Sequence, residues 1–154
     1  MFLAYEVKPQ YISKAPKKRG PQIGSSADIF AYALPLWEET ADMEIRERFL
    51  AVYLSRANRV ICHEWISIGG TCGTVVDMKL VALTAVKSLA SNVIFAHNHP
   101  SGNLKPSDAD IRLTQKAIQG LRLLDFCLLD HCILAMDDNG EPTYFSFADQ
   151  GILE

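Results

Sequence analysis

The sequence contains no hydrophobic run long enough to cross a membrane. Polar or charged residues interrupt every apolar stretch before it reaches the roughly 20 residues that a membrane-spanning helix needs. The N-terminus also lacks the apolar core and the cleavage site of a secretory signal peptide. We therefore expect a cytoplasmic protein that has no membrane partner.

A strong charge excess and paired cysteines are absent as well. Lysine and arginine together number 15, and aspartate and glutamate 18, so the formal net charge is only −3. No overall basic field would attract nucleic acid. None of the four cysteines forms a CxxC pair, and Cys62 and Cys132 lie in apolar, strand-like runs. We expect these two thiols to be reduced and buried, as is usual in the cytosol.

The 154 residues are 49% hydrophobic, which suffices for one globular domain with a core. We divide the chain into an N-terminal arm at residues 1–24 and a domain at residues 25–154. Within the arm, prolines and glycines surround a basic cluster of Lys14, Lys17, Lys18 and Arg19. This composition favours a solvated connector, and weak contact with nucleic acid is the alternative.

Hydrophobic periodicity and capping residues predict alternating strands and helices. The expected helices are 26–37, 77–90 and one that begins at Ser107, and the expected strands are 49–55, 60–68, 92–97, 126–136 and 143–147. Such alternation is typical of the α/β class, so we expect a mixed sheet flanked by helices.

The most informative segment joins one of these strands to one of these helices. His97 and His99 close an apolar run, and side chains two residues apart in a strand point to the same side. Ser107 and Asp110 share one face at the start of the following helix. Two imidazole nitrogens and one carboxylate oxygen make a zinc site with one position left for water, which is typical of catalytic zinc.

Each residue of this cluster also has a structural interpretation. A single histidine at a strand end is usually a satisfied polar residue, but the pair with a spaced aspartate favours a metal. Ser107 and Asp110 have the spacing of a helix-capping box, which would occupy the carboxylate and conflict with a ligand role for Asp110. The upstream histidines favour the ligand role.

Glu64 lies in the middle of an expected strand, on the same face as Cys62 and Ile66. A carboxylate that points into a core is costly without a partner, so Glu64 is a candidate functional residue. An outward-facing glutamate on an edge strand is the alternative. His131, which follows Asp130, has either a supporting role near a metal or a structural role.

Several other families of metal enzyme are excluded by spacing. The sequence has neither the His-x-Glu and Pro-Cys-x-x-Cys segments of zinc deaminases nor the His-Glu-x-x-His of zincins. The metallo-β-lactamase pattern requires an Asp-His pair where this chain has Ser101 and Gly102.

The spacing of His97, His99, Ser107 and Asp110 resembles the JAMM motif of the JAB/MPN metalloproteases. The segment HNHPSG, followed by PSDAD, resembles the corresponding segment of the RadC family of bacterial proteins. Further similarity covers roughly residues 25–148, in the segments Glu64–Thr71, Leu128–Ile133 and Tyr144–Phe147.

The resemblance implies a single JAB/MPN-like domain with a cytidine-deaminase-like fold. It also implies a zinc-dependent hydrolase of peptide or isopeptide bonds, in which His97, His99 and Asp110 hold Zn²⁺. Glu64 is then the general base, and the Ser107 hydroxyl stabilises the oxyanion. The substrate is expected to be a protein or peptide.

Two other functions stay open. The RadC family is commonly associated with DNA repair, so an accessory factor in nucleic-acid processing is one alternative. The acidic balance argues against strong DNA binding, as does the lack of room for the helix-hairpin-helix region that family members usually carry. A catalytically silent scaffold is the other alternative, although every residue of the motif is present.

Overall fold

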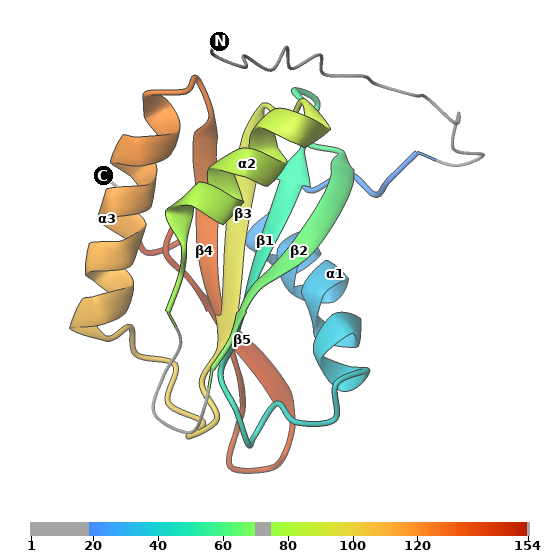
Figure 1. Ribbon diagram of the computed structural model, residues 1–154. Helices are drawn as coiled ribbons and strands as arrows, with labels where there is room; N and C mark the ends of the chain where they lie inside the picture. Colours follow the sequence, from blue (N-terminus) through green and yellow to red (C-terminus); the bar gives the residue numbers. More distant parts are fainter. Residues whose placement is uncertain (1–18, 70–74, 154) are drawn as a thin grey trace, which may run out of the picture.

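The computed structural model describes residues 19–69 and 75–153. This part of the chain forms a five-stranded sheet, in the order β2-β1-β3-β4-β5, with helices on both faces (Figure 1). The elements in chain order are α1 (Ser26–Glu38), β1 (Arg48–Leu54), β2 (Val60–Ile68), α2 (Met78–Ser88), β3 (Asn92–Asn98), α3 (Asp108–Arg122), β4 (Cys127–Met136) and β5 (Pro142–Ser146).

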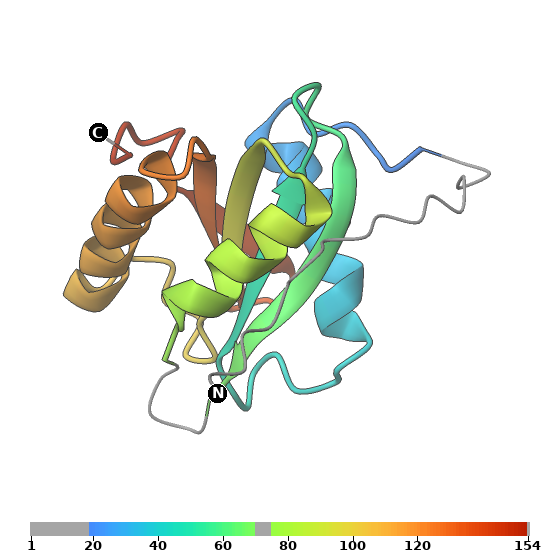
Figure 2. The ribbon, with the colours of Figure 1, turned by 45° about the horizontal axis from the view of Figure 1, so that its top comes forward.

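The sheet is mixed. β1 runs antiparallel to both β2 and β3, β4 runs parallel to β3, and β5 runs antiparallel to β4. The helices α2 and α3 cover one face and α1 covers the other (Figure 2). The predicted α/β class with a mixed, helix-flanked sheet is therefore confirmed.

The helix starts follow from their capping residues. The Asp77 side chain accepts a hydrogen bond from the backbone N–H of Lys79 at the start of α2. The Ser107 hydroxyl caps α3 in the same way by accepting from Asp110. Both caps satisfy backbone N–H groups that have no partner within the helix, and both begin helices that the sequence predicted.

The central strands β1 and β3 are buried on both faces, which explains their nearly continuous apolar sequence. On one face Leu50 and Ile94 pack towards α1, with Trp37 fully buried among them. On the other face Ala51 and Phe95 pack towards α2 and α3. The candidate site described below lies at the end of this strand pair where Phe49 is opposite His97.

The predicted arm lies partly outside the described residues, which begin at Arg19. Its last residues contact the domain, because the Val60 N–H donates to the Pro21 carbonyl at 2.9 Å and the side chain of Ile23 enters the core. A Cβ atom on Gly20 would lie 2.0 Å from the Val60 oxygen, so only glycine fits that close approach.

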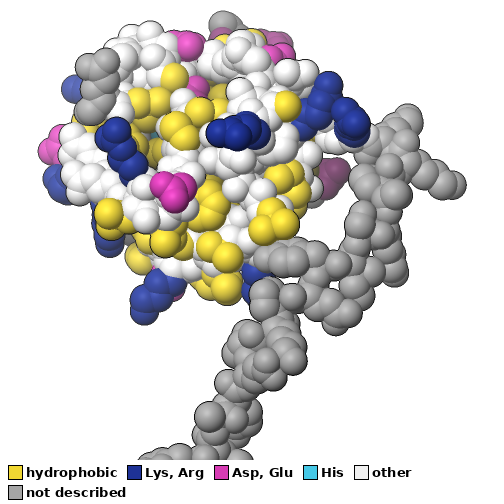
Figure 3. Space-filling model, turned by 90° about the horizontal axis from the view of Figure 1, so that it is seen from above, with side chains coloured by type: hydrophobic (Ala, Val, Ile, Leu, Met, Phe, Trp, Pro, Cys, Tyr) yellow, Lys and Arg dark blue, Asp and Glu magenta, His cyan; other side chains and the backbone are white. Residues whose placement is uncertain are grey.

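Cys132 is buried and Cys62 is half-buried, and both are free thiols as predicted. No helix in the described part of the chain is long and apolar enough to cross a membrane. Seen from above, charged side chains of both signs are scattered among apolar and neutral surface (Figure 3). This distribution agrees with the small net charge.

Candidate metal centre

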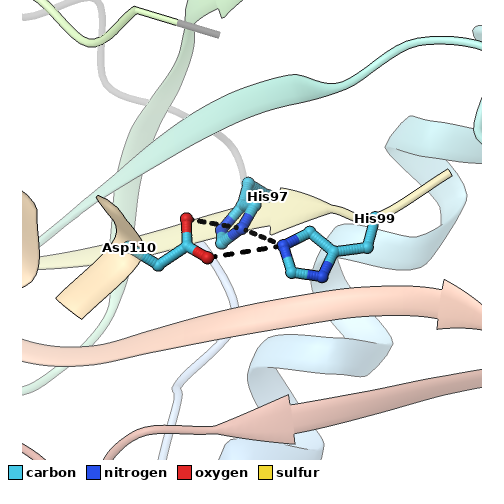
Figure 4. Close-up of side chains that lie close together, drawn as sticks. All are labelled: His97, His99 and Asp110. Carbon is cyan, nitrogen blue, oxygen red and sulfur yellow. Dashed lines mark hydrogen bonds and ion pairs between the residues drawn. The ribbon is translucent and has the colours of Figure 1, made fainter. Parts of the chain in front are cut away.

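His97, His99 and Asp110 point toward one another at the end of β3 and the start of α3 (Figure 4). The Nε2 atoms of the two histidines lie 2.9 Å apart. The Asp110 carboxylate lies 3.3 Å from Nε2 of His97 through Oδ1 and 3.5 Å from Nε2 of His99 through Oδ2. His97 is completely buried and Asp110 is only 8% exposed, so the cluster is largely shielded from water.

The connection between β3 and α3 brings these side chains together. His97 lies in β3, and His99 directly follows that strand, where its backbone N–H still donates to the Leu134 carbonyl at 2.9 Å. Because residues two apart in extended chain share a face, both histidines lie on the side that α3 covers. The loop then turns back at Gly102, whose φ of +80° is readily adopted by glycine. Asp110 stands in the first turn of α3 and therefore faces the end of β3 that the chain has just left.

The hydrogen bond of His99 assigns its tautomer. Its Nδ1 lies 2.5 Å from the backbone carbonyl oxygen of Asn103. A carbonyl oxygen can only accept, so Nδ1 carries the proton and the lone pair of Nε2 faces the cluster. Neutral imidazole in this tautomer is the form that binds a metal ion through Nε2.

A buried chain of hydrogen bonds assigns the same tautomer to His97. Thr114 Oγ1 donates to the backbone carbonyl of Asp110 at 2.7 Å, so it accepts from Nδ1 of His131 at 2.7 Å. Nε2 of His131 then accepts from Nδ1 of His97 at 2.8 Å. His131 thus supports a candidate ligand directly, which the sequence left undecided.

Asp110 combines two roles that the sequence analysis treated as conflicting. Its Oδ2 accepts hydrogen bonds from the backbone N–H of Ser107 at 2.7 Å and from the Ser107 hydroxyl at 2.6 Å. These contacts complete the capping box of α3. The other oxygen, Oδ1, faces His97. The expected conflict is absent because the carboxylate completes the cap through Oδ2 alone, which leaves Oδ1 available to a metal ion.

Burial and neighbouring charge oppose each other at this site. Without a metal ion, Nε2 of His97 and His99 can each bind a proton and donate to the Asp110 carboxylate. These contacts outweigh burial, which alone would raise the pKa of the Asp110 carboxyl, and they lower that pKa. Burial drives the pKa of His131 well below its usual value, which keeps that ring neutral. The cluster is therefore an anionic carboxylate that faces imidazole nitrogens.

These three residues fit a metal ion. One ligand atom from each residue lies within 4.8 Å of the others, and each histidine has its remaining nitrogen occupied by a hydrogen-bond partner. Two nitrogens and one carboxylate oxygen are a common ligand set for divalent metals, with a fourth position open. The described residues could hold one ion here.

Glu64 is not part of this cluster. Its carboxylate accepts a hydrogen bond from Thr84 of α2 at 2.6 Å. Glu64 pairs with Ala51 of β1, which in turn pairs with Phe95 of β3. His97 lies two strands and two residues away from Glu64, which corresponds to roughly 12 Å between the Cα atoms. The sequence correctly placed Glu64 on an inward face, but its partner there is a helix hydroxyl.

Glu47 lies beside the cluster instead, and the sequence analysis did not identify it. It directly precedes β1, whose Phe49 pairs with His97, so the register continued by two residues places Glu47 opposite His99. Burial raises the pKa of the Glu47 carboxyl, and the charge of Asp110 raises it further while the two histidines lower it. Glu47 could be identified only from the antiparallel pairing of β1 with β3, which the sequence analysis did not predict.

Comparison with known proteins gives the family. The family model described as RadC-like JAB domain matches residues 23–152. The chain belongs to the RadC family. This assignment confirms the resemblance that was drawn from the HNHPSG and PSDAD segments.

Several curated proteins are similar to this chain in sequence. A UPF0758 protein of Flavobacterium johnsoniae is 38% identical over 131 residues, which cover 85% of this chain and 53% of the relative. One from Porphyromonas gingivalis is 44% identical over 108 residues, covering 70% of this chain and 46% of the relative. UPF0758 protein YfjY of Escherichia coli is 40% identical over 108 residues, covering 70% and 64%. The chain spans about half the length of most of these curated relatives.

Proposed function

We propose that this RadC-like JAB domain is a zinc-dependent hydrolase of peptide or isopeptide bonds. The observation that carries the proposal is the convergence of His97, His99 and Asp110 on one point at the end of β3. The ligand set and the open fourth position favour a catalytic metal over a structural one. Zinc, when bound, polarises the scissile carbonyl and lowers the pKa of water to about 7.

Glu47 takes the role of general base that the sequence analysis gave to Glu64. A general base must lie within reach of the proton that it accepts, and Glu47 lies beside the cluster whereas Glu64 bonds to Thr84. The raised pKa of Glu47 also suits a carboxylate that first accepts a proton from the attacking water and then delivers it to the leaving amine.

Ser107 is proposed to donate a hydrogen bond to the oxyanion. Its hydroxyl donates to Oδ2 of Asp110 at 2.6 Å and accepts from the Asp110 N–H at 3.1 Å. In this arrangement the hydroxyl orients the carboxylate. Donation to a substrate oxygen requires the hydroxyl to rotate away from Asp110 while the helix cap stays in place.

The first test of this proposal concerns the metal. Protein purified without chelators is expected to contain about one zinc per chain, because three ligands and one water make one site. His97→Ala and Asp110→Ala should each abolish zinc binding as measured by elemental analysis. A His63→Ala variant serves as a control, since His63 bonds to Tyr32 on the other face of the sheet. Full zinc retention in both ligand variants would refute the metal site.

The second test separates the two glutamates. Glu47→Gln keeps the side-chain shape but cannot accept a proton, so we expect zinc to be retained and peptide cleavage to fall about 10²–10⁴-fold. Glu64→Gln is the matched control and should leave the cleavage rate within about twofold of wild type, because its partner is Thr84. A library of peptides and isopeptides supplies the substrates. If the cleavage rate falls in Glu64→Gln but not in Glu47→Gln, Glu64 and not Glu47 is the general base.

A further inference from the structure

Asn98 lies between the two histidines, and its side chain occupies the opposite face of the sheet. None of its surface is exposed. Because alternate residues of a strand point to opposite faces, Asn98 faces α1 while His97 and His99 face α3. The proposed mechanism gives Asn98 no chemical role, so this completely buried polar side chain requires another explanation.

All hydrogen-bonding positions of the Asn98 amide are occupied. Its Oδ1 accepts from the indole N–H of Trp37 and from the backbone N–H of Arg48, both at 2.8 Å. Its Nδ2 donates to the backbone carbonyl of Met43 at 2.6 Å and to that of Arg46 at 2.9 Å. The amide therefore binds three points of the backbone, two in the segment between α1 and β1 and one at the first residue of β1.

Two of these three points flank Glu47. The Arg46 carbonyl lies before it and the Arg48 N–H lies after it, and both contact Asn98. The carbonyl of Glu47 itself accepts from the N–H of Gly69 at 2.8 Å. Fixed peptide groups on both sides leave the Glu47 side chain with little freedom beyond its own rotamers.

We propose that Asn98 is a positioning residue that holds Glu47 at the metal centre. The inference rests on the proposed function, in which Glu47 is the general base. The end of β3 then positions both the metal ligands and the general base. His97 and His99 face the metal, and Asn98 between them holds the backbone that carries Glu47. A displacement of about 1 Å at a reacting group can reduce a rate on the order of 10²-fold.

Hydrogen exchange in the metal-free protein tests the positioning directly. Asn98→Ala removes all four hydrogen bonds, and we expect the amides of Arg48 and Gly69 to exchange on the order of tenfold faster by NMR. Trp37→Phe is the matched control: it removes the indole donor to the same oxygen, leaves both contacts that flank Glu47, and should leave these two exchange rates unchanged. An unchanged Gly69 rate in Asn98→Ala would overturn the proposal.

Asn98→Asp provides a second variant in case the alanine protein does not fold. It keeps the size of the side chain but replaces the Nδ2 donor with an oxygen that faces the carbonyls of Met43 and Arg46. We expect it to accelerate exchange at Gly69 as Asn98→Ala does. Wild-type exchange at Gly69 in a folded Asn98→Asp protein would overturn the proposal in the same way.

A cobalt-substituted protein tests the consequence for the metal centre. Glu47→Gln should change the visible absorption of bound Co²⁺, because the metal-bound water loses its acceptor. Asn98→Ala should cause the same change and add nothing in the Glu47→Gln background, whereas additive changes would contradict the proposal. Failure of the wild-type protein to bind Co²⁺ would instead contradict the proposed function, and the exchange rates would still decide the role of Asn98.

Discussion

At the scale of single residues, side chains that alternate along a β-strand place three consecutive residues on two different faces of the sheet. His97 and His99 face α3 and Asp110, and Asn98 faces α1 and Trp37. A shift of one residue in the register of β3 would exchange these faces, so the site depends on the pairing of this strand with its neighbours.

His131 belongs to the same scale, because it supports a single nitrogen of a single ligand. His131→Phe keeps the stacking of the ring on Phe147, whose centroid lies 4.8 Å away, but removes the acceptor for Nδ1 of His97. Loss of such a supporting hydrogen bond typically lowers metal affinity about 10–100-fold, and we expect a loss in this range. Competition with a chelator of known affinity measures it.

A matched control for this variant is His63→Phe, which changes a histidine bonded to Tyr32. It should leave zinc affinity unchanged. Equal affinities of wild type and His131→Phe would show that the buried hydrogen-bond chain from His97 to Thr114 does not contribute to metal binding.

At the scale of elements, the segment between α1 and β1 is held by Asp42. Its backbone carbonyl accepts from the N–H groups of Ile45 and Arg46, at 2.9 and 3.0 Å. Its carboxylate accepts two hydrogen bonds from the Arg48 guanidinium, at 2.7 and 2.6 Å. This segment carries Glu47 to the candidate metal site, so the ion pair fixes the position at which the chain enters β1.

The ion pair predicts a pH dependence of stability. Hydrogen bonds from Arg48 lower the pKa of the Asp42 carboxyl from 3.8 to about 2. A lowered native pKa stabilises the fold above the unfolded pKa, and this stabilisation is lost as the pH falls from about 4 towards 2. The side chains are 13% and 15% exposed, so solvent screening reduces the effect to roughly 1–2 kcal/mol.

Asp42→Asn should therefore lower the free energy of unfolding by roughly 1–2 kcal/mol at pH 7, measured by urea denaturation. The difference from wild type should shrink as the pH is lowered below about 4. A difference of the same size at pH 7 and pH 3 would show that the charge of Asp42 is not its cause.

At the scale of the whole molecule, the basic cluster of the arm is the feature that favours contact with nucleic acid. Most of it lies outside the described residues, and the face seen in Figure 3 carries charged side chains of both signs. Binding through a few lysines would be electrostatic and independent of sequence, and it would weaken steeply as salt rises. The metal site would not take part in such binding.

Deletion of residues 1–18 is expected to abolish any DNA binding and to leave zinc binding intact. The deletion stops there because the backbone of Pro21 and the side chain of Ile23 contact the domain. Fluorescence titration with duplex and single-stranded DNA, at low and at physiological salt, compares the two proteins. Tight binding by the shortened protein at physiological salt would favour a DNA-processing role over the hydrolase.

The sequence by itself determined the elements and the grouping of His97, His99 and Asp110. Short apolar runs, the caps Asp77 and Ser107, and the turn residues between strands act over a few residues, so their consequences are visible locally. The spacing of His97, His99 and Asp110 is of the same kind, because one strand end and one helix start are enough to bring them together.

Only the tertiary structure decided which carboxylate and which supporting residues join that cluster. Glu47 is near because β1 lies between β2 and β3, and Glu64 is distant because β2 is an edge strand. His131 and Asn98 reach their partners across separations of 34 and up to 61 residues. Strand order and face packing arise from long-range burial of the whole core, and no local pattern encodes them.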